Sequence, residues 1–253
     1  MKAGVLLFME NWKVYMVWGA YASIGLSVLV FLVYHLRLAL VREYKAKYDF
    51  INQREIGTYM FCGYLIIIAG WFFLNSLFSD REQIDVGIFI ARLLGTLIFA
   101  SIFMVVIHNV LKIYYPAAME KKLNKWRYKP RKNPKNGKEM TLLSEEEEDV
   151  YLTEGMQAEE SAFSVDYDVW IDKETGETHI EKYEGHKHAE KCDNCGFQTL
   201  KLYKEEVVAS PTEHSKGELI KYYECTYCGH KTSKGFSIGK VKAEQPQSEQ
   251  NPV

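Results

Sequence analysis

The chain has 253 residues, which is enough for one or two domains. Its formal net charge of -2 averages two unlike halves, because nearly all long apolar runs precede Tyr115 and nearly all charge runs follow it. A single domain of uniform composition is therefore excluded, and each half has to be read by itself.

Three long apolar segments predict that the N-terminal half spans a membrane. They cover about 14–36, 57–78 and 86–113, within a membrane domain at 14–116 that follows a short extracytoplasmic N-terminus at 1–13. Crossing a bilayer core of ~30 Å takes roughly 20 apolar residues in a helix, because unpaired backbone groups are costly in lipid. The first run is too long for a cleavable signal and lacks a small-residue cleavage site, so we expect a retained anchor.

The distribution of lysine and arginine predicts the orientation of these spans. The stretch after the first span carries Arg37, Arg42, Lys45, Lys47 and Arg54. The stretch after the third span carries nine basic residues from Lys121 to Lys138, whereas the opposite side has only Lys2, Lys13 and Arg81. Basic loops stay on the cytoplasmic side. We therefore expect a multi-pass protein of the bacterial cytoplasmic (inner) membrane, with its N-terminus outside and its C-terminal half in the cytoplasm.

Among the ionisable side chains inside the apolar segments, one arginine and two histidines are candidates for function. Arg92 is about two turns into the third span; it either joins a polar pathway or, as we expect, reaches outward toward Glu82 or Asp85. His35 and His108 lie near the cytoplasmic ends of the first and third spans, where two histidines could ligate a haem. Hydrogen-bonded interfacial histidines are the commoner case, so we do not expect haem.

Five cysteines are present, of which Cys62 lies alone in an apolar run and four form two C-x-x-C pairs. The pairs are Cys192 with Cys195 and Cys225 with Cys228, and each is followed by a glycine. Their separation of 29 residues fits metal ligation better than a disulfide framework. Tetrahedral zinc takes four such thiolates, and a site filled by four cysteines leaves no open position. We therefore predict one structural zinc ion, in a reducing compartment.

The sequence around the cysteine pairs predicts a zinc ribbon at 183–241. Alternation such as Leu200 with Leu202 and Ile220 with Tyr222 suits a small antiparallel sheet pinned at one end by the metal. Four nearby histidines are expected to be exposed polar residues rather than ligands: His186, His188, His214 and His230. The polar stretch 242–253 is expected to be disordered.

The segment 117–182 consists of a basic and acidic linker followed by a short domain. This domain repeats the spacing of the turns in the ribbon but lacks the cysteines. Two polar turns stand where cysteine turns would be expected, Asn133-Pro-Lys-Asn136-Gly137 and Asp172-Lys-Glu-Thr175-Gly176. Their separation of 35 residues is close to that of the cysteine pairs. Ordinary polar turns would look the same, so this internal comparison does not decide by itself.

The strings "YLTEGMQAEE" and "SVDYDVW" connect this segment to a known family. With the cysteine pairs, they make the stretch from Arg131 to Val241 resemble the cytosolic tail of bacterial TPM-domain membrane proteins, in which two zinc ribbons follow a transmembrane helix. The resemblance implies that the family's ligand positions in the first ribbon correspond here to Asn133, Asn136, Asp172 and Thr175. Those residues make a poor zinc site, so we predict a degenerate, metal-free first ribbon. The TPM domain itself is absent, and no activity of that domain is carried over.

A ribbon without its metal needs another source of stability. The candidates are the apolar side chains of one predicted strand and its neighbour, buried against the intact ribbon: Val165, Tyr167, Val169, Trp170 and Ile180.

A basic block from Lys121 to Lys138 is followed at once by an acidic run from Glu145 to Glu160. The basic block is expected to contact anionic lipid headgroups. Nucleic acid is the alternative, since Trp126 and Tyr128 lie among the basic residues. The acidic run would repel it, so we expect membrane lipid as the partner and not nucleic acid.

No nucleophile–base arrangement, phosphate loop, dinucleotide fingerprint or metalloprotease signature is found, so we do not expect an enzyme. The predicted fold class is a membrane α-helical protein with three transmembrane helices and small β zinc-ribbon cytosolic domains. We expect a membrane anchor or accessory subunit whose ribbon binds a protein partner, in a membrane complex or homo-oligomer. The alternative is a subunit of an oligomeric channel or transport complex, in which Arg92, His35 and His108 face a shared interior. Loss of transport on neutral substitution of Arg92 would favour that alternative.

Overall fold

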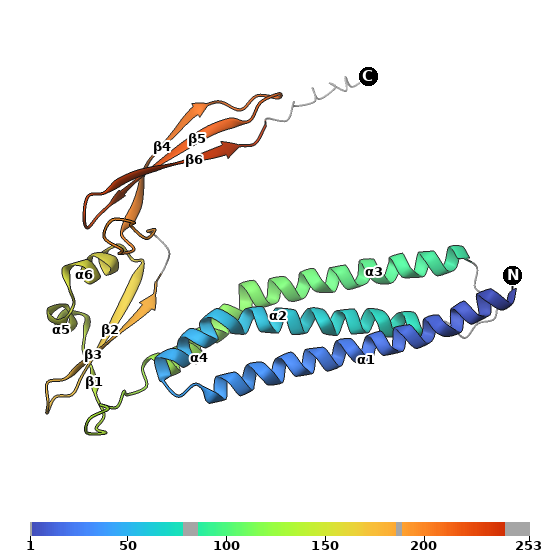
Figure 1. Ribbon diagram of the computed structural model, residues 1–253, viewed down its shortest axis with the longest axis horizontal. Coiled ribbons are helices and arrows are strands. Elements are labelled where there is room, and N and C mark those ends of the chain that lie inside the picture. The colour runs from blue at the N-terminus through green and yellow to red at the C-terminus, as the bar shows by residue number, and fades with distance from the viewer. Residues whose placement is uncertain (1, 78–85, 186–188, 241–253) are drawn as a thin grey trace, which may run out of the picture. The chain divides into compact units, whose positions relative to one another are not determined.

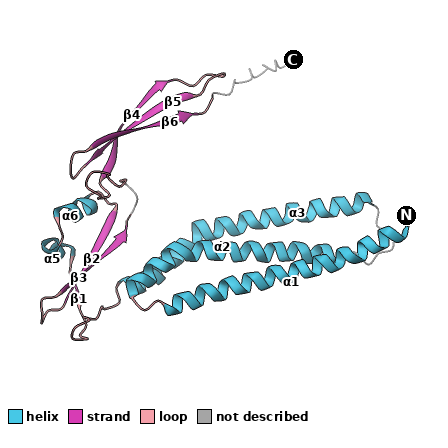
Figure 2. Ribbon diagram, in the orientation of Figure 1, coloured by secondary structure: helices cyan, strands magenta, loops and turns pink. Residues whose placement is uncertain are grey.

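The computed structural model describes residues 2–77, 86–185 and 189–240, and the chain divides into two compact units. The first, Met1–Lys129, is here called the helical unit, and the second, Pro130–Val253, the sheet unit. Figure 1 and Figure 2 show helices alone in the first, and two small sheets with short helices in the second. Each unit is described by itself.

The helical unit is built from three long helices and their extension. In chain order these are α1 (Lys2–Leu40), α2 (Tyr44–Ser76), α3 (Val86–Asn109), the π-helical turn η1 (Val110–Tyr114) and α4 (Tyr115–Arg127). α2 packs along both α1 and α3 (Figure 1). Three helical stretches, Asn11–Leu40, Tyr44–Ser76 and Gly87–Arg127, are long and apolar enough to cross a membrane, which confirms the prediction of three such helices.

Small residues set the distance between these helices. A Cβ atom added to Gly19 of α1 would lie 3.0 Å from the ring of Phe72, and one added to Gly63 of α2 would lie 3.0 Å from Ile107 of α3. Such close approach is the usual basis of helix association in lipid, where burial of apolar surface gives no advantage.

The helices run well beyond the apolar segments. α2 begins at Tyr44, ahead of the apolar run, and α4 follows the third apolar run where the sequence suggested a linker. The buried side chains of Ile51, Met119 and Leu123 form a small core between α2 and α4. α4 is therefore part of the helical unit and not a loose connection.

The first sheet has the strand order β1-β2-β3, with all pairs antiparallel. Its elements are β1 (Thr141–Leu142), α5 (Glu145–Glu148), the 3-10 turn η2 (Asp149–Tyr151), α6 (Glu154–Ser161), β2 (Val165–Ile171) and β3 (Thr178–Glu184). Its core consists of Leu152, Val165, Tyr167 and Val169, with Ile180 partly buried beside them. Four of the five predicted apolar side chains therefore pack within this sheet and its helices, where burial against the second ribbon was expected, and Trp170 is the exception.

Trp170 faces away from that core. It lies under the guanidinium group of Arg131, 4.8 Å from the ring centre to Cζ. Arg131 in turn binds the carboxylate of Glu181 through two hydrogen bonds of 2.7 and 2.6 Å, and all three side chains are buried. A paired, doubly hydrogen-bonded charge is the form in which an ion is tolerated inside a protein.

The second sheet has the strand order β4-β5-β6, again antiparallel. Its strands are β4 (Leu200–Ala209), β5 (Gly217–Cys225) and β6 (Lys231–Ile238), which are the three strand-like runs expected from the sequence. Only the end of the sheet next to the cysteines has a core, formed by Leu200, Tyr223 and two cysteines. Most side chains at the far end are exposed.

The two sheets touch through the loop that joins Cys195 to β4. The backbone N–H of Gln198 donates to the buried carboxylate of Glu159 on α6 at 2.7 Å, and the Ser164 hydroxyl donates to the Gln198 carbonyl. The ring of Phe197 lies so close to Gly155 of α6 that an added Cβ atom would be 2.3 Å from it. Glycine at position 155 is thus a requirement of this contact.

Candidate metal centre

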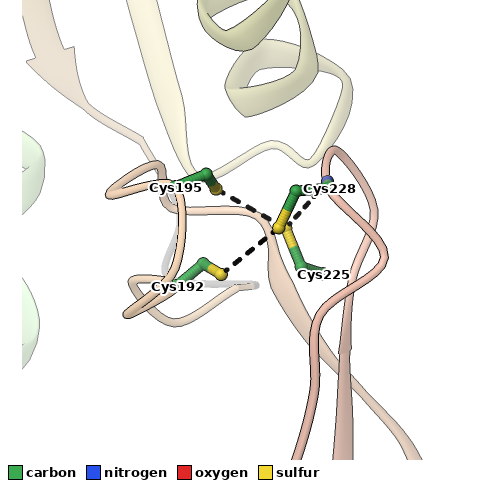
Figure 3. A group of neighbouring side chains, drawn as sticks. All are labelled: Cys192, Cys195, Cys225 and Cys228. Carbon is green, nitrogen blue, oxygen red and sulfur yellow. Dashed lines mark hydrogen bonds between the residues drawn. The ribbon is translucent and has the colours of Figure 1, made fainter.

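The four cysteines of the predicted site lie together at the near end of the second sheet. Cys192 and Cys195 belong to a turn before β4, whereas Cys225 ends β5 and Cys228 lies in the turn to β6. Their Sγ atoms are all within 4.8 Å of one another, and the four side chains point toward a common centre (Figure 3). None of the four forms a disulfide bond.

Each pair of cysteines sits in the same backbone turn. The N–H groups of Cys192 and Cys225 each donate to the carbonyl five residues further on, at 2.8 Å in both turns. The N–H groups of Gly196 and Gly229 donate back to the carbonyls of Cys192 and Cys225, at 2.8 and 3.0 Å. The two glycines have φ of 81° and 71°, a region that residues with a Cβ rarely adopt. The glycine after each pair is therefore part of the turn.

The sulfur separations match those of a four-thiolate metal ion. The Cys192 and Cys228 Sγ atoms are 3.7 Å apart, and those of Cys195 and Cys225 are 3.8 Å apart. A tetrahedron with metal–sulfur bonds of about 2.3 Å has sulfur–sulfur edges of about 3.8 Å. The residues present thus fit a tetrahedral metal ion.

Neighbouring donors favour the thiolate form of Cys225 and Cys228, whereas burial raises the pKa of the Cys195 thiol to about 11. The Cys228 backbone N–H points at the Cys225 sulfur at 3.3 Å, the Thr199 hydroxyl lies 3.1 Å from it, and the Asn194 amide donates to the Cys228 sulfur at 3.4 Å. Burial raises the pKa of Cys225, but the hydrogen bonds from Cys228 and Thr199 outweigh this and lower its pKa to about 6. Thiolates are the form that binds metal.

The histidines considered as reserve ligands are not among the groups that converge on this centre in the described part of the chain. His214 is exposed in the turn between β4 and β5, and His230 is half-buried. His186 and His188 lie outside the described residues.

A second centre occupies the corresponding end of the first sheet. The N–H groups of Asn133 and Asp172 donate to the carbonyls five residues further on, at 2.8 and 2.9 Å, and those of Gly137 and Gly176 donate back at 2.8 and 2.7 Å. Both glycines have φ of 71°. These are the backbone bonds of the cysteine turns, so the two sheets share one turn geometry.

Side-chain hydrogen bonds fill this second centre. The Asp172 carboxylate accepts from the amide nitrogens of Asn133 and Asn136, at 2.7 and 2.6 Å, and the Asn133 amide also lies 3.4 Å from the Thr175 hydroxyl. The amide oxygens accept from the backbone N–H groups of Lys135 and Lys138, which fixes the amide nitrogens as the inward-facing atoms. Inward N–H groups are donors to an anion and do not coordinate a cation.

The hydrogen bonds from Asn133 and Asn136 hold the pKa of Asp172 well below its usual range. The family resemblance pointed to these four positions, but the sequence analysis assigned the stability of this domain to apolar side chains. It missed that the replacing side chains bond to one another, because the complementarity of an acid with two amides is visible only once the turns are placed together.

Carboxylates also close the open edge of β2. Glu148 of α5 accepts from the Val169 N–H at 3.2 Å, and Glu160 of α6 accepts from the Tyr167 N–H at 2.9 Å. Glu145 lies near both, with carboxylate oxygens of the three residues within 4.8 Å. Burial first, and the neighbouring acids second, raise the pKa values of Glu148 and Glu160 to about 7 despite these bonds.

The ionisable residues singled out within the spans have separate surroundings. Arg92 lies over the ring of Phe89, with 5.2 Å from Cζ to the ring centre, whereas its suggested partners Glu82 and Asp85 lie outside the described residues. The Nδ1 atom of His108 is 2.8 Å from the hydroxyl of Tyr64 on α2. His35 instead lies against aromatic rings of its own helix, Phe31 and Tyr34.

A buried carboxylate in the helical unit escaped the sequence analysis. Glu55 of α2 is 0% exposed and accepts hydrogen bonds from Tyr34 of α1 at 2.6 Å, and from Tyr115 and Lys122 of α4 at 2.6 and 2.5 Å. It stands just before an apolar run, where a single acid usually marks the boundary of a span. The sequence offered one indication of this contact: an acidic residue precedes the second span and lysines follow the third, so the two could form an ion pair.

Comparison with known proteins adds no relative. No protein-family model, no curated protein and no solved structure matches the chain. The resemblance of the tail to TPM-domain membrane proteins therefore stays a prediction that rests on the residues quoted for it.

Proposed function

We propose that the chain is a non-enzymatic anchor or accessory subunit of the bacterial cytoplasmic membrane, which presents a cytosolic zinc-ribbon module to a protein partner. The three apolar helices support the anchor, and the excess of lysine and arginine after the first and third spans supports a cytoplasmic sheet unit. A reducing compartment also suits four cysteines that form no disulfide bond.

The metal in this proposal is one zinc ion held by Cys192, Cys195, Cys225 and Cys228. The single observation that carries it is the pair of sulfur separations of 3.7 and 3.8 Å, since four thiolates at that spacing leave no position for water or substrate. Its role would be structural, because binding such an ion supplies folding free energy to a sheet with a small core.

Metal analysis of the full chain, purified in mild detergent without added chelator, tests this assignment. One zinc per chain is expected. Zero would refute the metal site, and two would refute the metal-free reading of the first sheet. The variant Cys62→Ser should keep its zinc, whereas Cys228→Ser should lose most of it, although both remove one thiol.

The surface proposed to meet the partner is one face of the far end of the second sheet. Val207, Leu219 and Phe236 are direct cross-strand neighbours on β4, β5 and β6, and Val207 and Phe236 are 53% and 43% exposed. Apolar side chains grouped on an exposed sheet face are typical of a protein-binding surface. Lys221 and Lys234 flank the row on the same face, where they are ion-paired with Glu205 and Glu190, so the partner should meet this row mainly with apolar side chains.

Substitution on each face tests this surface. Val207→Ser with Phe236→Ser should abolish co-purification of the partner from membranes of the native cell while zinc content stays at one per chain. Tyr203 is equally exposed, but its ring lies against Tyr222 on the opposite face, so Tyr203→Ser is the matched control and should retain the partner. Equal loss with both variants, or loss with neither, contradicts the proposed surface.

A further inference from the structure

The helical stretch that leads from α3 to the end of α4 contains one residue more than a continuous α-helix would need to cover the same path. The π-helical turn η1 (Val110–Tyr114) interrupts it, and a π turn closes i→i+5 hydrogen bonds instead of i→i+4. Each α-helical residue advances the chain by about 100°, so the residues after η1 are rotated by about that angle relative to an uninterrupted helix. In this rotation, Tyr115 and Lys122 point at Glu55.

The sequence repeats both of these Glu55 donors one position earlier. Tyr114 precedes Tyr115, and Lys121 precedes Lys122. If η1 became α-helical, each residue of α4 would take the place of the residue after it. Tyr114 and Lys121 would then stand beside Glu55 and offer it the same hydroxyl and ammonium groups. In the present rotation both are exposed, Tyr114 by 72%.

We propose that α4 has two registers, with η1 present or absent, and that Glu55 is paired with a tyrosine and a lysine in both. The inference does not depend on the proposed metal or partner. Because the chain after Arg127 is attached through α4, a change of register turns its point of departure from the helical unit by about 100°. With two registers, α4 could rotate about its own axis relative to the spans and turn the start of the chain that follows it.

The observed register is the more stable of the two. In the other, the places of the buried Met119 and Leu123 would be taken by Ala118 and Lys122, with less apolar burial. Pro116 also favours η1, because proline has no N–H and its ring clashes with the carbonyl four residues earlier in a regular helix. The register without η1 is therefore a minor state, which a substitution can make the major one.

Lysine acylation of the full chain in lipid nanodiscs, read for each lysine by mass spectrometry, distinguishes two registers from one. In the unaltered chain, Lys121 should react faster than Lys122, whose ammonium is held by Glu55. In Lys122→Met, Glu55 keeps a lysine only if Lys121 moves into the vacated place. The reactivity of Lys121 should then fall at least about fivefold, with exposed Lys216 as the internal reference.

Two further variants complete the test. Adding Glu55→Gln to Lys122→Met should restore the reactivity of Lys121, because its new partner is gone. Pro116→Ala should lower the reactivity of Lys121 even with Lys122 in place, because the helix without η1 becomes less costly. A Lys121 that stays fully reactive in Lys122→Met overturns the proposal, whether α4 remains ordered or not, since the second register should hold α4 in place of the first.

Discussion

At the residue scale, the same backbone turns surround two chemically different centres, one at the end of each sheet. In the second sheet, four sulfur atoms surround a position suited to a metal ion, and in the first, one carboxylate accepts from two amides. The Asp172 carboxylate takes the place that a metal ion would have, because both amide groups of the other turn donate hydrogen bonds to it. One chain thus contains both a centre suited to a metal ion and a centre filled by its own side chains.

Placing four cysteines in the first centre should create a second metal site. The variant with Asn133, Asn136, Asp172 and Thr175 all replaced by Cys should bind two zinc ions per chain instead of one, because the backbone of these turns already has the required form. Metal analysis checks the count. The three-cysteine variant that keeps Asn136 is the control, and an equal gain there would mean that four thiolates are not required at this centre.

Removing the central acceptor should weaken the first sheet alone. Asp172→Ala leaves the buried amide of Asn133 and the exposed amide of Asn136 without their acceptor, and the unpaired buried amide should cost about 2 kcal/mol of local stability. Hydrogen exchange of β2 and β3 amides should accelerate accordingly in this variant. Chelation of the unaltered chain should accelerate β4 to β6 much more than β2 and β3; uniform acceleration would contradict two separate centres.

Raising the pH should also loosen the first sheet. The folded pKa values of Glu148 and Glu160 are about 7, above the usual value of 4.5. Their protonated forms therefore favour the folded state, and this contribution is complete below about pH 4.5 and lost as the pH rises through about 7. Glu159, Glu181 and Asp172 have lowered pKa values, so their stabilising contribution is constant in this window and is lost only as the pH falls below the usual carboxyl pKa.

The check is hydrogen exchange of β2 amides between about pH 5 and 8, corrected for the intrinsic rate. Protection should decrease across this window in the unaltered chain. In Glu148→Gln with Glu160→Gln, the decrease should be largely absent, since neither side chain titrates. A decrease of the same size in the double variant would assign the effect to other groups.

Secondary-structure elements were foreseen where one periodic pattern dominates them. The three apolar spans, the alternating strand β2 and the strands β4 to β6 follow from the sequence, because their side chains alternate or are apolar throughout. α4 was not foreseen, since five of its thirteen residues are charged and its buried stripe has only Met119 and Leu123. The π turn before it leaves no pattern in a single sequence, apart from the doubled tyrosine and lysine.

The contact between α6 and the first cysteine turn predicts a distant effect on metal binding. Gly155→Ala would push the ring of Phe197 away from α6 and disturb the loop that follows Cys195. Affinity for zinc should fall by about tenfold or more, as it does when supporting residues of a metal site are altered. Competition with a chelator measures this, with Ala158→Gly on the same helix as the control; unchanged affinity in Gly155→Ala would show that the loop is held by the metal alone.

For the whole molecule, the decisive property is the side of the membrane on which the sheet unit lies. The basic residues after the first and third spans predict the cytoplasm. A thiol reagent that cannot cross membranes should therefore leave Cys192 and its three partners unlabelled in intact cells, even after chelation, and label them in inverted vesicles. Labelling in intact cells would reverse the topology and remove the support for a reducing compartment.

The second sheet has its core at the cysteine end alone, whereas its far end consists of three strands with exposed faces. If a metal ion binds the cysteines, the order of the far end would depend on it through the strand pairing. A partner bound at Val207 and Phe236 would then favour the same ordered sheet as an ion bound to the sulfur atoms. By thermodynamic linkage, each would increase the affinity of the sheet for the other by the same factor. At a low concentration of the ion, the affinity for the partner would therefore fall.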